Sequence, residues 1–283
     1  MNERPRRLRV GVIGDPVAHS LSPALHQPAL DALGVPATFE RWRTTAADLP
    51  GRIAGLRAAD ALGASVTVPH KVAVMSLVDE VAPAARRAGA VNTVVNRDGA
   101  LIGDNTDIHG FATSLAGACS DVATRPALLL GAGGAARAVA LALESLGVPE
   151  IALANRDPAR AARLAADLAV LHMTTVPFDE ATLRRRLPET RLLVNCTSLG
   201  WKAGETPMAL DLLALLPDDA LVADLTYRQT DLLQAAANRD LPTLDGLGML
   251  VHQGAKAFAL WTGRAAPVDA MFAAAWAARD ANA

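Results

Sequence analysis

Two hydrophobic patterns recur along the chain, and each predicts one kind of element. Short apolar runs bounded by turn residues predict buried strands, and longer segments with helical spacing predict helices. In the first part of the sequence the predicted strands are 8–13, 38–42, 64–67, 90–96 and 100–103. Helices are predicted over 22–33, from about 71, over 83–88, and from Thr106 or Asp107 to 118. Between the last two strands, Asp98-Gly99 is typical of a hairpin turn.

After Pro126 strands and helices alternate regularly. The predicted strands cover 127–130, 150–154, 192–195 and 220–225, and the predicted helices cover an alanine-rich segment from after Ala136 to 146, and then 158–168, 231–238 and 247–262. Such alternation predicts a parallel sheet covered on both faces. The chain therefore belongs to the α/β class. Its 283 residues exceed the usual size of one core, so two domains are expected.

Composition and charge exclude several classes of protein. Hydrophobic residues make up 51% and charged residues 20%, as in globular proteins. A net charge of -2 gives no general attraction to nucleic acid or to an anionic membrane. No stretch approaches the roughly 20 apolar residues needed to cross a bilayer, and the run after Arg7 is too short for a signal peptide. Two cysteines, Cys119 and Cys196, suggest neither a disulfide framework nor a metal site, and a cytoplasmic setting is expected.

A glycine-rich turn marks the predicted nucleotide site. Gly131 follows the strand 127–130, Gly133 lies two residues on, and Ala136 stands at the third position of the dinucleotide-binding pattern. The helix that follows offers free backbone N–H groups to phosphates. The plainer interpretation is a turn that merely connects a strand to a helix. The flanking strand and helix favour the nucleotide site.

Cofactor choice is predicted from the residues after the next strand. Arg156 and Arg160 can bind a 2′-phosphate through forked donors, which favours NADP. Asp157 stands between them, and a carboxylate there can instead bind the ribose hydroxyls of NAD. The plainer alternative is that both arginines lie on a solvated helix face. NADP is the predicted cofactor, with NAD as the alternative.

Polar residues upstream of this turn form the candidate substrate site. Ser20 and Ser22 alternate, so in an extended segment both hydroxyls point the same way and can bind a carboxylate. Lys71 with Asp107 forms a plausible proton-transfer pair for an alcohol oxidation. Each has a plainer interpretation alone: Ser22 and Asp107 as helix caps, and Lys71 as a surface lysine. Their joint presence with nearby Thr67 and asparagines favours the catalytic interpretation.

Seven motifs in order give the chain a resemblance to the shikimate dehydrogenase family over nearly its full length. They are Ser20-Leu21-Ser22-Pro23, Val66-Thr67-Val68-Pro69-His70-Lys71, Gly89-Ala90-Val91-Asn92-Thr93, Gly103-Asp104-Asn105-Thr106-Asp107, the Gly131 turn, Asn155-Arg156, and Asp245-Gly246-Leu247-Gly248-Met249-Leu250 with Gln253. The resemblance implies reversible reduction of 3-dehydroshikimate to shikimate with NADPH. It also implies an N-terminal α/β substrate domain (1–107 with 248–283) and a Rossmann-type NAD(P)-binding domain (108–247), with C-terminal helices returning to the first domain and a cleft between the two.

The resemblance assigns roles to individual residues. Lys71 and Asp107 are the implied catalytic pair, meeting at the mouth of the pocket. The implied substrate-binding residues are Ser20, Ser22, Ser65, Thr67, Asn92, Tyr227 and Gln253. The implied cofactor-binding residues are Gly131, Gly133, Gly134, Ala135, Asn155, Arg156, Arg160, Thr197, Gly246 and Met249. No metal is expected, because the histidines lack ligand spacing and are predicted to be surface or packing residues.

Three positions depart from the family pattern and keep alternatives open. The family usually has asparagine in place of Ser65, glycine in place of Ile108, and threonine or serine in place of Asp157. The first two leave room for a quinate or amino-substituted substrate, and the third for NAD. An alternative of another class is a non-catalytic nucleotide or metabolite sensor on the same scaffold. A folate-linked dehydrogenase fits the Ser20 and Ser22 segment poorly. The expected partner is a small molecule, and the chain is expected to be a monomer or homodimer.

Overall fold

The computed structural model of the chain describes residues 7–170 and 172–281, and these divide into two compact units. The first unit combines residues up to 110 with those from 251, and the second covers 111–250. Both division points lie within helices, α4 (Asp107–Ala118) and α9 (Leu247–Thr262), so each of these helices contributes to both units. The boundaries predicted from the sequence lie at the first turns of the same two helices.

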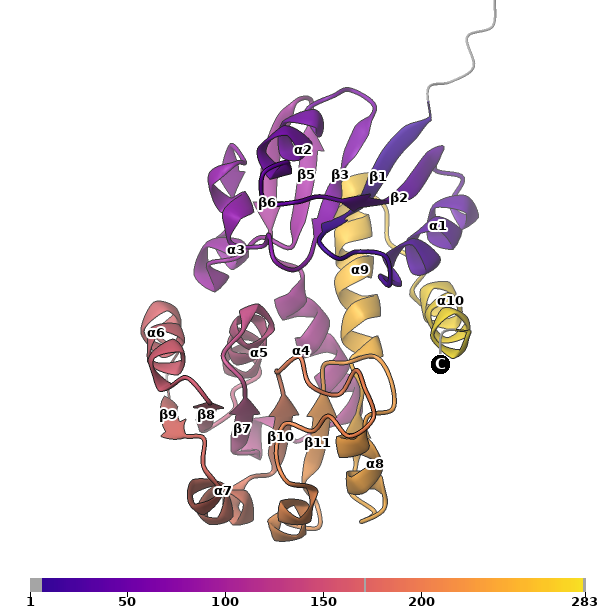
Figure 1. Ribbon diagram of the computed structural model, residues 1–283. Helices are drawn as coiled ribbons and strands as arrows, with labels where there is room; N and C mark the ends of the chain where they lie inside the picture. The colour runs from indigo at the N-terminus through magenta and orange to yellow at the C-terminus, as the bar shows by residue number, and fades with distance from the viewer. Residues whose placement is uncertain (1–6, 171, 282–283) are drawn as a thin grey trace, which may run out of the picture. The chain divides into compact units, whose positions relative to one another are not determined.

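The first unit is built on a mixed six-stranded sheet with the order β2-β1-β3-β5-β6-β4. Its strands are β1 (Leu8–Gly14), β2 (Ala37–Arg43), β3 (Ala61–Val66), β4 (Glu80–Val81), β5 (Thr93–Arg97) and β6 (Ala100–Asp104). Its other helices are α1 (Ser22–Ala32), α2 (Leu49–Gly55), α3 (Pro83–Ala88) and α10 (Val268–Asp280). Strands β2, β1 and β3 are parallel, whereas β3, β5 and β6 pair antiparallel. Figure 1 shows α2 and α3 on one face of this sheet and α1 and α9 on the other.

The hairpin between β5 and β6 confirms the turn predicted from the sequence. Asp98 has φ 52° and Gly99 has φ 92°, so both central residues adopt the left-handed region. Positive φ at both positions matches the twist of the flanking strands, and Asp-Gly is a favoured pair for it. Asn92 directly precedes β5, and Asp107 follows the end of β6 by three residues, so both lie at the end of the hairpin away from the turn.

The helix predicted to begin near Lys71 is wrong. Lys71 lies in a turn, and only a short 3-10 helix, Ala73–Ser76, follows it. Helical hydrogen bonding does not extend through this segment, because its backbone bonds to a neighbouring segment instead: Val91 N donates to Lys71 O over 2.7 Å. Nothing in the sequence indicated α2, whose seven residues include Pro50, Gly51 and Gly55.

The second unit is a fully parallel six-stranded sheet with the order β12-β11-β10-β7-β8-β9. Its strands are β7 (Ala127–Leu130), β8 (Ile151–Asn155), β9 (Met173–Pro177), β10 (Leu192–Asn195), β11 (Leu221–Asp224) and β12 (Thr243–Leu244). Its own helices are α5 (Gly134–Ser145), α6 (Pro158–Leu168), α7 (Glu180–Arg186) and α8 (Asp231–Ala237), with 3-10 helices at Val122–Thr124, Leu187–Glu189 and Leu210–Leu215. Numbered within the unit, the strand order is that of the dinucleotide-binding fold, and this order reverses between the neighbouring parallel strands β7 and β10.

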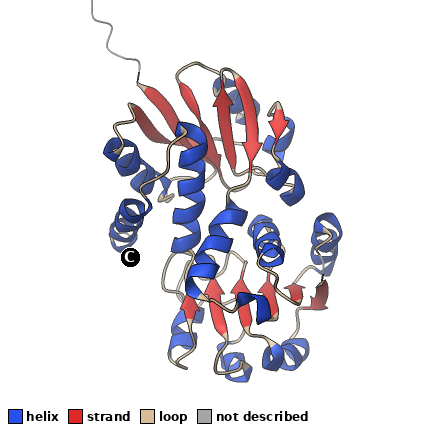
Figure 2. Ribbon diagram, turned by 180° about the vertical axis from the view of Figure 1, so that it is seen from behind, coloured by secondary structure: helices blue, strands red, loops and turns tan. Residues whose placement is uncertain are grey.

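Burial explains which elements of this unit the sequence revealed. All four residues of β7 are buried, as are all of β10 and β11, and each strand begins with at least three apolar residues in a row. The edge strand β9 exposes most of its residues, so no such run marks it. A leucine-rich core packs α7 and α8 against one face of the sheet, and helices lie on both faces (Figure 2). Within the described ranges, no helix is long and apolar enough to cross a membrane.

His26 in α1 is a packing residue, as the sequence predicted, and its environment has a consequence for stability. It is 1% exposed and stacks on Phe39 at 4.5 Å, with Trp261 at 5.3 Å. Neither ring nitrogen has a hydrogen-bond partner among the described residues. Burial lowers the pKa of His26 to about 3. The imidazole ring is therefore neutral in the folded protein at neutral pH, because its buried site disfavours the charged form.

We expect His26 to destabilise the protein as the pH falls. Because its folded pKa is below the unfolded value, its contribution is fully present above about pH 6.5 and is lost between pH 6.5 and 3, at roughly 1.4 kcal/mol per pH unit. Denaturant unfolding of His26→Phe from pH 7 to 4 should show a flatter dependence than wild type. His19→Phe, at an exposed position, is the control; equal slopes for all three proteins would contradict the expectation.

Candidate active site

Lys71 and Asp107 meet in the first unit. Lys71 Nζ donates to Asp107 Oδ2 over 2.6 Å, and the two side chains are 22% and 9% exposed. Lys71 comes from the turn after β3, and Asp107 opens α4, where the helix N-terminus also favours a negative charge. The arrangement is a largely desolvated ammonium–carboxylate pair, which is able to exchange a proton with a bound hydroxyl.

Asn92 connects this pair to its surroundings. Asn92 Nδ2 donates to Asp107 Oδ1 over 2.8 Å and to Thr106 Oγ1 over 3.0 Å. Asn92 Oδ1 accepts from Thr106 N over 2.7 Å and from Thr93 Oγ1 over 3.0 Å. The amide of Gln253, on α9, lies at the edge of the same cluster, with Oε1 at 3.4 Å from Thr106 Oγ1. The structure therefore brings together four of the predicted residues and adds Thr93 and Thr106, which the sequence analysis did not single out as binding residues.

The backbone around Lys71 is fixed from both sides. Val91 N donates to Lys71 O, and Val66 N donates to Asn92 O over 2.7 Å. Just before Lys71, His70 is 2% exposed and its Nε2 lies 2.6 Å from Thr44 O. This imidazole anchors the turn that carries the lysine. This anchoring role goes beyond the surface or packing role predicted for the histidines.

The cap of α4 differs from the prediction that Thr106 or Asp107 would supply it. Asn105 Oδ1 accepts from Asp107 N over 3.1 Å and from Ile108 N over 3.4 Å. Asp107 does not cap the helix, and its two carboxylate oxygens accept instead from Lys71 Nζ and Asn92 Nδ2. The carboxylate is thereby kept for the ion pair.

Ser20 and Ser22 lie together, but not for the predicted reason. Ser22 is the first residue of α1, and Leu21 before it has helical φ and ψ, so the segment is not extended. The two hydroxyls still approach to 3.1 Å, and Ser22 N donates to Ser20 Oγ over 3.2 Å. Ser22 does not cap α1 either, since no side chain caps that helix. The pair presents two neighbouring hydroxyls at the start of a helix.

Ser65 and Thr67 follow one another on the same side of the chain at the end of β3. Ser65 lies directly opposite Thr93, a member of the Asn92 cluster. Ser65 is 7% exposed, and its Oγ has no hydrogen-bond partner among the described residues. Thr67 packs closely on Gly14, where an added Cβ would lie 2.4 Å from Thr67 Cγ2. A buried hydroxyl without a partner is costly unless a bound molecule supplies one.

The glycine-rich turn of the second unit leaves room for a phosphate group. Gly131 has φ +103°, and a Cβ added there would lie 2.9 Å from Thr197 Cγ2, so only glycine fits. A Cβ at Gly134 would meet nothing within 4 Å, and one at Gly133 only Arg160 Nη2 at 3.8 Å. Gly134 and Ala135 open α5, whose free N–H groups face this space. The turn also follows β7, where the strand order of the sheet reverses, which is the usual place for a dinucleotide.

Residues after β8 frame the other end of this site. Asn155 Oδ1 accepts from Ala132 N over 3.1 Å, and Arg160 Nε donates to Ala132 O over 2.9 Å. Asp157 caps α6 by accepting from Arg160 N over 3.1 Å, and Arg156 is exposed beside it. The Asp157 carboxylate therefore has a structural partner of its own. The binding of a 2′-phosphate by Arg156 and Arg160 stays a prediction.

Gly246, Met249 and Tyr227 also lie in the second unit. A Cβ at Gly246 would lie 2.1 Å from Leu225 O, so this glycine allows two backbones to touch. Met249 lies three residues further, in the first turn of α9. Tyr227 follows β11, is the only tyrosine of the chain, and stacks edge-on against Trp201 at 5.0 Å. Burial raises the pKa of Tyr227, so its hydroxyl keeps its proton at neutral pH.

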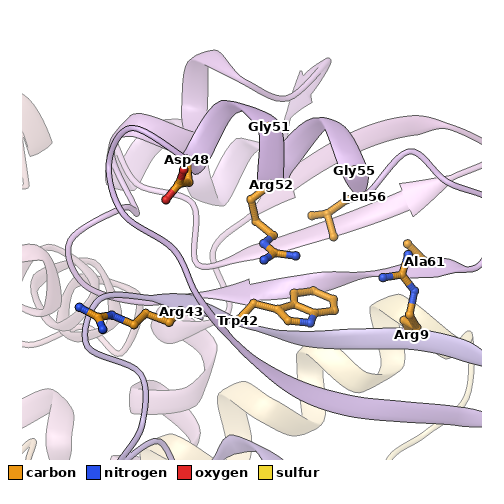
Figure 3. A pocket seen from close by; sticks show the side chains of 9 residues that line it. All are labelled: Arg9, Trp42, Arg43, Asp48, Gly51, Arg52, Gly55, Leu56 and Ala61. Atoms are coloured by element: carbon orange, nitrogen blue, oxygen red, sulfur yellow. The ribbon is translucent and has the colours of Figure 1, made fainter.

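A cavity of about 380 Å³ in the first unit contains none of the predicted residues (Figure 3). It lies beneath α2, where the Arg52 guanidinium stands 5.5 Å from the Trp42 ring. Arg9 and Arg43, at its edges, already form ion pairs with Asp60 and Asp15. The candidate site is thus defined by its hydrogen-bonded side chains rather than by the shape of this cavity.

The fold and these side chains define a class of protein: a dehydrogenase with a dinucleotide-binding unit and a separate unit that carries an ammonium–carboxylate pair. Among the described residues, no group of three histidine, cysteine or acidic side chains is placed to hold a metal. Family models match three segments: the shikimate dehydrogenase substrate binding domain at residues 12–94, shikimate / quinate 5-dehydrogenase at 114–201, and the shikimate 5'-dehydrogenase C-terminal domain at 246–275. The chain belongs to the shikimate dehydrogenase family.

Individual relatives agree with this placement. The shikimate dehydrogenase (NADP(+)) of Symbiobacterium thermophilum is 48% identical over 95% of this chain and 94% of its own length. The structure of shikimate 5-dehydrogenase from Thermus thermophilus in complex with NADP(H) and shikimate is similar with a TM-score of 0.86 and 42% identity, covering 96% of this chain and 99% of that one. Quinate dehydrogenase from Corynebacterium glutamicum in complex with NAD has a TM-score of 0.87 at 30% identity, covering 95% and 99%.

Proposed function

We propose that this chain is a shikimate dehydrogenase that reversibly reduces 3-dehydroshikimate to shikimate with NADPH. The observation that carries the proposal is the 2.6 Å contact between Lys71 Nζ and Asp107 Oδ2 in a member of this family. Relatives named for this activity, at 48% identity over nearly the whole chain, support it. A non-catalytic sensor has no need of such a proton-transfer pair.

The proposed chemistry divides between the cofactor and the chain. Bound NADP(H) supplies or accepts the hydride, while the chain must move the proton of the reacting hydroxyl. In oxidation the neutral amine of Lys71, its own proton having passed to solvent, takes the proton of the hydroxyl and becomes the ammonium, and in reduction the ammonium gives a proton to the carbonyl oxygen and becomes the amine. Asp107 keeps the ammonium in place and orients the hydroxyl. Asn92, which binds Asp107 Oδ1, fixes the carboxylate for this role.

Substrate binding is assigned to the polar residues that the family motifs imply. Ser20 and Ser22, whose hydroxyls are neighbours, bind the carboxylate without a fixed positive charge. The residues proposed to bind ring hydroxyls are Ser65, Thr67, Asn92, Gln253 and Tyr227. These assignments rest on the family motifs and on the placement of the side chains described above.

Cofactor binding is assigned to the second unit. Gly131, Gly133, Gly134 and Ala135 bind the phosphates, and Asn155, Arg156 and Arg160 bind the adenosine end. Thr197, Gly246 and Met249 lie toward the ribose and nicotinamide. Arg156 and Arg160 favour NADP, as do relatives named for NADP(+), while Asp157 accepts one bond through Oδ1 as the cap of α6.

A second candidate substrate is quinate or an amino-substituted analogue. Ser65 supports it, because a short side chain with an unpaired hydroxyl leaves room for a further polar substituent or for a water. We further infer a cytoplasmic location, because Cys119 and Cys196 are both free thiols, as in reducing compartments. The working form is proposed to be a monomer or homodimer that needs no nucleic acid or membrane.

Initial rates test the proposal directly. Shikimate and quinate are each oxidised with NADP and with NAD, and nucleotide reduction is followed by absorbance. We expect shikimate with NADP to give the highest kcat/KM. A higher value for quinate or for NAD would overturn the corresponding assignment, and no nucleotide reduction with any cyclic polyol acid would favour the sensor.

A further inference from the structure

A carboxylate is buried in the second unit without a cation beside it. Asp224, the last residue of β11, is 1% exposed, and no ion pair to it forms within the described part of the chain. Removing a charge from water is costly unless hydrogen bonds replace the lost hydration. We therefore looked for what the buried carboxylate holds in position.

Four donors replace the missing hydration of Asp224. Oδ1 accepts from Thr226 N over 2.9 Å and from Thr226 Oγ1 over 2.8 Å. Oδ2 accepts from Asn195 Nδ2 over 2.9 Å and from Thr230 Oγ1 over 3.1 Å. One donor, Asn195, is the last residue of β10, and the other three belong to Thr226 and Thr230 in the loop after the adjacent strand β11. Each oxygen accepts two bonds, so the carboxylate ties the loop after β11 to the end of β10, where the loop after β10 begins.

Asn195 extends this network into the first loop. It is 0% exposed, and its Nδ2 also donates to Leu199 O over 3.1 Å. Its Oδ1 accepts from Thr197 N over 3.0 Å and from Thr197 Oγ1 over 2.7 Å. Gly200 then passes close to the network, where an added Cβ would lie 3.6 Å from Asp224 Oδ2.

The two loops carry the aromatic pair. Trp201 directly follows Gly200, and Tyr227 directly follows Thr226. Each aromatic residue is therefore next in sequence to a residue that lies close to Asp224. The rings meet edge-on, with centroids 5.0 Å apart and an interplanar angle of 81°. Arg228 Nη1 donates to Trp201 O over 2.7 Å and closes the link between the loops.

We propose that Asp224 is a positioning residue that, through Thr226 and through the loop bearing Trp201, holds the Tyr227 phenol in one orientation for the substrate. This inference rests on the proposed function for the role of the phenol. The position of the ring itself follows from the second unit alone. Without the network, the loop would be mobile and the Tyr227 side chain would be free to change its rotamer.

Because Tyr227 is the only tyrosine, protein labelled with 3-fluorotyrosine gives one ¹⁹F resonance that reports on it alone. We expect one narrow signal in the wild type, displaced from free 3-fluorotyrosine by the Trp201 ring. Thr226→Val, which removes one bond to Asp224, should shift this signal toward the free value and broaden it. Thr226→Ser, which keeps the hydroxyl, should restore the wild-type spectrum.

Thr190→Val is the matched control. Thr190 is a buried threonine of the same unit, 5% exposed against 3% for Thr226, and its hydroxyl donates to Arg186 O over 2.9 Å. This variant loses one buried hydroxyl bond and should leave the ¹⁹F signal unchanged. In kinetics, Thr226→Val should raise the KM for shikimate about five- to tenfold with kcat less affected, as for the loss of one substrate hydrogen bond. Thr190→Val should not change KM.

The outcomes separate the two ideas. Identical ¹⁹F spectra for Thr226→Val and wild type, or equal changes in Thr226→Val and Thr190→Val, would overturn the positioning role. A moved signal with unchanged KM would show that the orientation of the ring is not used by the reaction, and would also overturn it. If wild type binds NADPH but oxidises no shikimate, the proposed function fails, while the ¹⁹F spectra still decide whether Asp224 fixes the ring.

Discussion

Replacing Lys71 by alanine is expected to lower kcat for shikimate oxidation by about 10²–10⁴-fold, the usual contribution of general acid–base catalysis. KM should change far less, because the hydroxyls assigned to substrate binding lie on other residues. The reason is geometric: Lys71 Nζ contacts Asp107 Oδ2 at 2.6 Å, and the turn that carries it is fixed through Val91 and His70. Steady-state kinetics with saturating NADP measure the effect.

Lys256→Ala is the control for this experiment. Lys256 is an exposed lysine on α9 in the same unit, so its removal takes away one ammonium without touching the pair. Its kinetics should match wild type. A Lys71→Ala variant that keeps near-normal turnover would remove the lysine from proton transfer and leave Asp107 as the group to test next.

The strands and helices with strong local signals could be predicted from the sequence. Strand β7 is buried along its whole length and reads as four apolar residues, and the Asp98-Gly99 turn has the residue types that its dihedral angles require. Elements without such signals were missed. The edge strand β9 is mostly exposed, and α2 includes one proline and two glycines in seven residues, so packing rather than propensity maintains it.

Residues of the candidate site could be predicted where the side chain itself has the required chemistry. They could not be predicted where their role comes from a hydrogen-bond network. Lys71 and Asp107 are 36 positions apart, yet the motifs were enough to pair them. The role of Thr93 in the site could not be predicted from the sequence, because threonine is common in strands for its strand propensity alone. Its role comes from the contact of its hydroxyl with Thr106 Oγ1 at 3.1 Å, which depends on the pairing of β5 with β6.

The serine pair shows how a correct expectation can rest on a wrong premise. Ser20 and Ser22 were expected to align because alternate residues of an extended chain share a face. Their segment instead turns into α1, and the hydroxyls meet because Ser20 folds back over the first turn of the helix. Spacing alone does not distinguish these two geometries.

Replacing Asp107 by asparagine is expected to reduce kcat about 10²-fold or more, with a smaller change in KM. Asp107 accepts from Lys71 through one oxygen and from Asn92 through the other. An asparagine must turn its NH₂ group toward one of these donors, so one of the two bonds is lost. We also expect the free energy of unfolding to fall by about 1–3 kcal/mol. Asp60→Asn is the control, since Asp60 pairs with Arg9 in the same unit and is 16% exposed.

Combining Asp107→Asn with Lys71→Ala shows whether the two side chains act as one unit. If Asp107 serves by holding and orienting Lys71, removing it from a protein that already lacks the lysine should cost little more in kcat. Groups that act together are strongly non-additive in this way. Losses that multiply would instead mean that the carboxylate acts on the substrate independently of the ammonium, and Asp107 would then be the group that moves the proton.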